Sequence, residues 1–128
     1  MARILIVDDE EMDRVFLASM LQDAGHEPLF AADGQAALRI WRNSAVDLVV
    51  TDIVMPELNG VELLETLKRE DPGVLVIAMS GISAKNLNKA ARSGAVAILT
   101  KPVDPQELLT EISGALKASN SDGGLDPG

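Results

Sequence analysis

Five short apolar runs alternate with longer stretches of helical spacing, and this alternation limits the possible folds more than any other feature of the chain. The runs cover residues 4–7, 29–32, 48–51, 74–79 and 96–99. Unbroken apolar runs of this length are typical of strands that are buried on both faces of a parallel sheet. Right-handed crossovers then place helices on both sides of the sheet. The sequence therefore predicts an α/β fold of the (βα)5 type, a doubly wound parallel five-stranded sheet.

Proline and capping residues refine this prediction. Pro28 removes a backbone donor within the second run, which favours an edge position for that strand. The flavodoxin-like strand order 2-1-3-4-5 satisfies this condition. Asp104 followed by Pro105 is typical of a helix start. Further expected boundary residues are the N-caps Asp33 and Ser83 and the helix-ending glycines Gly25 and Gly94.

The helical stretches differ in the quality of their apolar faces. Met12, Phe16 and Met20 stand four residues apart, and this spacing predicts the buried face of the first helix. The stretch 84–92 has the poorest apolar face, so we expect its helix to be the least firmly packed. Residues 1–118 are expected to form one domain, and the small and polar residues 119–128 a flexible tail or a truncated linker.

Composition narrows the possible functions. The chain has 128 residues, 20 acidic against 11 basic, and a formal net charge of −9. Such a charge opposes direct binding to nucleic acid or to anionic lipid. The absence of cysteine excludes thiolate catalysis and disulfides. No apolar run reaches the roughly 18 residues of a membrane span, and no secretion signal is evident. We therefore expect a cytoplasmic domain without membrane contact.

Polar residues follow four of the predicted strands at their carboxyl ends. Asp8 and Asp9 follow the first strand, Asp52 the third, Ser80 the fourth and Lys101 the fifth. Each alone has an alternative interpretation as a turn, cap or surface residue, but parallel strands bring all of them to one edge of the sheet. Three close carboxylates need a cation, and Mg²⁺ prefers oxygen ligands. Asp52, on the central strand, is the best placed nucleophile for a phosphoryl group.

These residues occur in motifs that resemble those of the bacterial response-regulator receiver domain. The motifs are Ile4 to Glu10, Asp52-Ile53-Val54-Met55-Pro56 with Gly60, Ser80-Gly81, and Lys101-Pro102. The resemblance covers about residues 3–118. It implies that Asp52 accepts a phosphoryl group, and that Mg²⁺ is held by Asp8, Asp9, Asp52 and the backbone carbonyl of Val54. It further implies that Ser80 and Lys101 contact the phosphoryl group and that the bond before Pro102 is cis.

The resemblance also implies partners. The phosphodonor would be a sensor histidine kinase or a histidine phosphotransfer protein, and a downstream output protein or domain would read the altered surface. The sequence departs from the family in having Ile98 at the position where many members carry an aromatic switch residue. Val54 and Ile82 beside the site are both apolar and orient an attacking water poorly, which predicts a long-lived acyl phosphate.

Two other functions remain open from the residues alone. One is an aspartate-nucleophile phosphohydrolase of the haloacid dehalogenase kind, but Val54 stands where that chemistry expects an acidic residue. The other is a receiver-like interaction module that works without phosphorylation, which would be expected to lack the acceptor or the acid pair. We expect a signalling module rather than an enzyme, with only self-catalysed phosphoryl acceptance and slow loss of the group.

Overall fold

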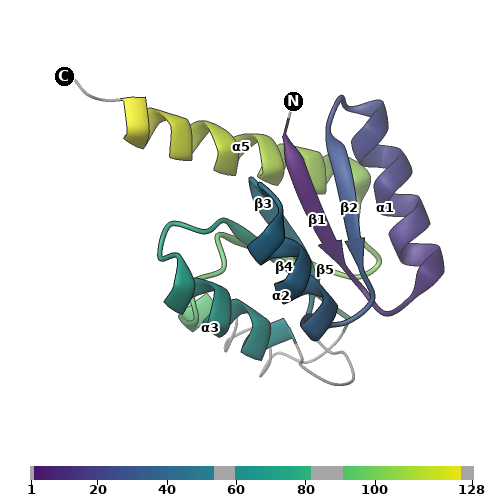
Figure 1. The fold of residues 1–128 in the computed structure, drawn as a ribbon. Coiled ribbons are helices and arrows are strands. Elements are labelled where there is room, and N and C mark those ends of the chain that lie inside the picture. The colour runs from purple at the N-terminus through teal and green to yellow at the C-terminus, as the bar shows by residue number, and fades with distance from the viewer. Residues whose placement is uncertain (1, 54–59, 82–90, 125–128) are drawn as a thin grey trace.

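The computed structural model describes residues 2–53, 60–81 and 91–124 (Figure 1). Its strands are β1 (Arg3–Val7), β2 (Glu27–Ala31), β3 (Leu48–Asp52), β4 (Val76–Ser80) and β5 (Ala97–Thr100). They form one parallel sheet with the order β2-β1-β3-β4-β5, which confirms the predicted fold and strand order. Pro28 lies on β2, at the predicted edge. The polar residues Asp52 and Ser80 extend β3 and β4 beyond the apolar runs.

The helices of the described part are α1 (Glu11–Asp23), α2 (Gly34–Asn43), α3 (Gly60–Glu70) and α5 (Pro105–Gly124). The Asp33 carboxylate accepts a hydrogen bond from the Ala36 N–H at 2.8 Å, so the predicted cap of α2 is confirmed. Gly25 and Gly94 have φ values of 90° and 103°, as expected for helix-ending glycines. Ser83 and most of the expected helix 84–92 lie outside the described residues. Helix α5 continues past residue 118, where the sequence placed the domain end.

Helices cover both faces of the sheet (Figure 1), and an apolar layer lies on each face. Alternate residues of each strand point to opposite sides, as the pleat requires. On β1, Leu5 and Val7 pack with residues of α2 and α3, whereas Ile4 and Ile6 pack with residues of α1 and α5. Both faces of the central strands are thus buried, which explains why their apolar runs are unbroken. No helix in the described part combines the length and the apolarity that a membrane crossing needs.

The predicted buried face of α1 is wrong for Met12 and Phe16, whereas Met20 is half-buried and packs against the core. Met12 is 78% exposed and Phe16 is 51% exposed. The buried residues of this helix are instead Leu17, Ala18 and Leu21. The helix carries apolar residues around most of its circumference, so a four-residue spacing selects more than one face. Contact with β1 and β2, rather than spacing, decides which face is buried.

Candidate functional site

Asp8 directly follows β1, and three hydrogen bonds hold it in place. Its backbone N–H donates to the Ala31 carbonyl at 3.1 Å, and its Oδ1 accepts a hydrogen bond from the Glu10 N–H at 2.9 Å. The Arg14 guanidinium donates to the Asp8 carbonyl oxygen at 2.6 Å. These contacts fix a fully buried carboxylate at the carboxyl edge of the sheet. Asp9, the next residue, is exposed.

Asp52 ends the central strand β3 and is 7% exposed. The residue after it, Ile53, donates its N–H to the Met79 carbonyl of β4 at 2.9 Å. The Ile53 carbonyl in turn accepts a hydrogen bond from the Gly60 N–H at 2.8 Å. A Cβ atom on Gly60 would lie 2.1 Å from the Asp52 carbonyl oxygen. The start of α3 therefore rests directly on the backbone that carries Asp52, and only glycine fits there.

The three acidic residues predicted from the sequence meet at this edge. Asp8, Asp9 and Asp52 each offer one carboxylate oxygen, and these oxygens all lie within 4.8 Å of one another. Burial raises the pKa of Asp8; the Glu10 N–H and Lys101 act against that rise, and the charge of Asp52 adds to it. A donor set of oxygen atoms alone, with mutual repulsion, fits a hard divalent cation such as Mg²⁺. The remaining predicted ligand, Val54, lies outside the described residues.

Lys101 closes the site from the β5 side. Its Nζ contacts Asp52 Oδ2 at 2.8 Å, Asp8 Oδ2 at 3.0 Å and Asp13 Oδ2 at 3.2 Å. Burial alone would lower the pKa of Lys101, but hydrogen bonds to Asp52 and Asp8 raise it above its ordinary value. The peptide bond between Lys101 and Pro102 is cis, as expected. The site thus pairs the Lys101 ammonium with two buried carboxylates, of Asp8 and Asp52, and with the more exposed one of Asp13.

Ser80 ends β4, which lies between β3, the strand that ends in Asp52, and β5, the strand that Lys101 follows. It is fully buried. Its carbonyl accepts a hydrogen bond from the Lys101 N–H at 2.9 Å. Within the described part of the chain, its Oγ has no hydrogen-bond partner. A buried hydroxyl without a partner is rare, and it suggests that a ligand atom supplies the missing bond in another state.

The structure adds two residues that the sequence analysis did not assign to the site. Asp13 contacts Lys101, and Arg14 braces Asp8. Asp13 belongs to an acidic run at a helix start, where negative charge is common. Arg14 carries no sequence signal that separates it from other surface arginines. The contacts of both depend on how α1 packs, which local sequence does not reveal.

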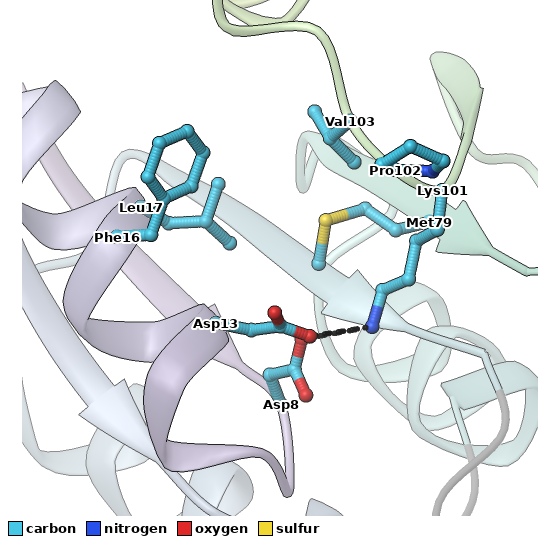
Figure 2. Close-up of a pocket in the computed structure, with 8 residues that line it drawn as sticks. All are labelled: Asp8, Asp13, Phe16, Leu17, Met79, Lys101, Pro102 and Val103. Atoms are coloured by element: carbon cyan, nitrogen blue, oxygen red, sulfur yellow. Dashed lines mark hydrogen bonds and ion pairs between the residues drawn. The ribbon is translucent and has the colours of Figure 1, made fainter.

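A pocket of about 200 Å³ opens beside the site, between α1 and the segment after β5 (Figure 2). Asp8, Asp13 and Lys101 converge at one end of it, and the rest of its wall is mostly apolar. The apolar lining residues are Phe16, Leu17, Met79, Pro102 and Val103.

Comparison with known proteins assigns the family. The family model of the response regulator receiver domain matches residues 4–113. A response regulator receiver protein of Anaeromyxobacter sp. is 39% identical over 110 residues, which are 85% of this chain and 46% of that protein. PilH of Pseudomonas aeruginosa is 38% identical over 121 residues, 91% of this chain and 98% of PilH. The chain therefore spans about half of one curated relative and nearly all of the other.

Solved structures agree. The crystal structure of a response regulator receiver domain protein from Clostridium thermocellum superimposes with a TM-score of 0.90 at 32% identity. The match covers 94% of this chain and 98% of that one. The chain belongs to the response regulator receiver domains, the signalling modules of two-component systems.

Proposed function

We propose that this receiver domain takes a phosphoryl group onto the Asp52 carboxylate and thereby changes a surface that a partner reads. The observation that carries the proposal is the position of Asp52. Its carboxylate lies beside those of Asp8 and Asp9, which follow β1, and its Oδ2 is 2.8 Å from the Lys101 Nζ. A nucleophile, a cation and an oxygen donor set for Mg²⁺ thus share one edge of the sheet.

The transfer step is a substitution at phosphorus. An Asp52 carboxylate oxygen forms the new P–O bond while the N–P bond of a phosphohistidine breaks, and the imidazole leaves with the bonding electron pair. Mg²⁺ held by Asp8, Asp9 and Asp52 would offset the negative charge on the phosphoryl oxygens. Lys101 would exchange its contact with Asp52 Oδ2 for one with a phosphoryl oxygen. The buried Ser80 hydroxyl, whose Oγ lacks a partner in the described residues, would donate to another.

The product carries about one to two more negative charges than the free carboxylate at a site built from fixed charges. Such a change biases a two-state surface toward one conformation. We propose a sensor histidine kinase or a histidine phosphotransfer protein as the donor, and a separate output protein or domain as the reader. The Anaeromyxobacter relative is about twice as long as this chain, which is consistent with an attached output region in some relatives. We propose that the domain acts with these partners in the cytoplasm.

The test is labelling with acetyl phosphate in the presence of Mg²⁺, read by intact mass. The wild-type protein should gain one phosphoryl group, removable by hydroxylamine as an acyl phosphate is. Asp52→Asn should gain none, because an amide is not a nucleophile of this kind. Asp23→Asn makes the same chemical change at an exposed position near the end of α1 and should be labelled like the wild type.

Two results would reject this assignment. One is a wild-type protein that stays unlabelled at high Mg²⁺ and donor concentration, which would favour the interaction module that works without phosphorylation. The other is equal labelling of Asp52→Asn, which would place the acceptor elsewhere. Chelation of Mg²⁺ should abolish wild-type labelling while leaving the protein folded.

A further inference from the structure

Asp13 reaches the site from a different element than the other carboxylates. It stands on the first turn of α1, and its Oδ2 lies 3.2 Å from Lys101 Nζ. The Asp13 side chain is 45% exposed, whereas those of Asp8 and Asp52 are 0% and 10% exposed. Figure 2 shows Asp13 and Asp8 directed toward the Lys101 ammonium at the polar end of the pocket.

The three contacts of Lys101 are not equivalent. An ammonium group has three N–H donors, and the structure gives Lys101 three carboxylate partners. Two of these, Asp8 and Asp52, also belong to the oxygen cluster that fits a divalent cation. Asp13 does not belong to that cluster. A cation held by Asp8 and Asp52 would offset their charge and repel the ammonium. Asp13 is then the contact whose attraction for Lys101 persists.

We infer that Asp13 is a positioning residue, which keeps the Lys101 ammonium beside Asp52 when Mg²⁺ is bound and no phosphoryl group has yet arrived. This inference rests on the function proposed above, because Lys101 matters there through its contact with the phosphoryl group. Without Asp13, the lysine side chain would turn away from the dication more often. The phosphoryl group would then more often arrive without its cationic partner, and transfer would slow.

The test compares Asp13→Asn with Asp13→Glu and with Glu11→Gln. Asp13→Glu keeps a carboxylate on a longer stem. Glu11→Gln removes one negative charge from the same helical turn, at an exposed position. The initial rate of labelling by acetyl phosphate is measured for each variant over a range of Mg²⁺ concentrations. This design separates the maximal rate from the Mg²⁺ concentration at half-maximal rate.

Asp13→Asn should lower the maximal labelling rate by roughly three- to tenfold, because one partly exposed charge-assisted contact is lost. Its half-maximal Mg²⁺ concentration should shift no more than that of Glu11→Gln. Asp13→Glu should recover most of the rate. The inference is overturned if Asp13→Asn and Glu11→Gln have equal maximal rates, or if Asp13→Glu is as slow as Asp13→Asn.

A second measurement does not depend on phosphorylation. The nitrogen-15 NMR signal of the Lys101 ammonium, assigned by its absence from Lys101→Met, reports how well the ammonium protons are held. With Mg²⁺, the signal should persist in the wild type and in Asp13→Glu and should broaden in Asp13→Asn through faster proton exchange. Loss of the wild-type signal on adding Mg²⁺ would contradict the inference. Failure of wild-type labelling would reject the proposed function instead. The NMR comparison would still test whether Asp13 positions the Lys101 ammonium.

Discussion

Replacement of Gly60 by alanine should destabilise the domain, because Gly60 packs against the backbone of the acceptor residue. An ideal Cβ on Gly60 would lie 2.1 Å from the Asp52 carbonyl oxygen, 2.6 Å from Ile53 Cα and 2.9 Å from the Asp52 carbonyl carbon. All three are backbone atoms, so no side-chain rotation can relieve the clash. Either α3 or the end of β3 has to move.

The size of the effect follows from this geometry. Forcing an extra carbon into a packed interior typically costs about 1–3 kcal/mol. Alanine gains up to about 1 kcal/mol over glycine inside a helix, but less at the first helical position. We therefore expect Gly60→Ala to lower the free energy of unfolding by about 2 kcal/mol. For a urea dependence of about 1–3 kcal/mol per M, the unfolding midpoint should fall by roughly 1 M.

Urea unfolding followed by tryptophan fluorescence measures this change. Trp41 is the only tryptophan, and it is partly buried against the core between the sheet and α2 and α3. Gly114→Ala is the matched control, since Gly114 lies exposed on α5, where an added Cβ would meet nothing within 4 Å outside the backbone of its own helix. The control should gain up to about 1 kcal/mol of stability from helix propensity. Equal midpoints for Gly60→Ala and the wild type would refute the packing argument.

Two further predictions concern the acyl phosphate and the histidine. Val54→Asn should shorten the lifetime of the acyl phosphate, because an amide can orient an attacking water and valine cannot. The lifetime is measured as the decay of the label after acetyl phosphate is removed. Decay of the wild-type label within seconds would contradict the expected long lifetime. His26 accepts a hydrogen bond at Nδ1 from the Ala2 N–H at 3.2 Å, and burial lowers its pKa below 6.5. As the pH falls through about 6.5, the unfolded chain takes up a proton before the folded one, so stability is lost. His26→Gln keeps a hydrogen-bond acceptor but has no group that titrates in this range. Between pH 7.5 and 5.5, the urea unfolding midpoint should fall less for this variant than for the wild type. Parallel profiles would show that His26 does not cause the loss of stability.

Part of the strand order was readable from the sequence. Pro28 marks an edge strand, but all five apolar runs are unbroken, so the full order came from the flavodoxin-like pattern that this edge position fits. The meeting of Asp8, Asp9 and Asp52 also followed, since the carboxyl ends of parallel strands share one edge of the sheet. Once the topology is known, residues distant in sequence are placed by their strands alone.

The packing of α1 was not readable, and the missed contact of Asp13 has the same cause. Leu17 and Leu21 are four residues apart, as are Met12 and Phe16, so spacing fits either pair. Only contact with the sheet selects the first pair for burial. That rotation of the helix also determines that Asp13 points to Lys101. Helix α5 runs to Gly124, into the small and polar residues whose composition predicts a tail from residue 119. The extent of the domain stays a prediction.

The two layers of helices act on different parts of the site. Helix α3 rests on the backbone of Asp52 through Gly60, on the face shared with α2. Helix α1 lies on the opposite face and contacts the Lys101 ammonium through Asp13. A change at Gly60 therefore displaces the nucleophile together with the core beneath it and should appear as lost stability. A change at Asp13 leaves the core intact and should appear in the rate of phosphoryl transfer and in the NMR signal of the Lys101 ammonium.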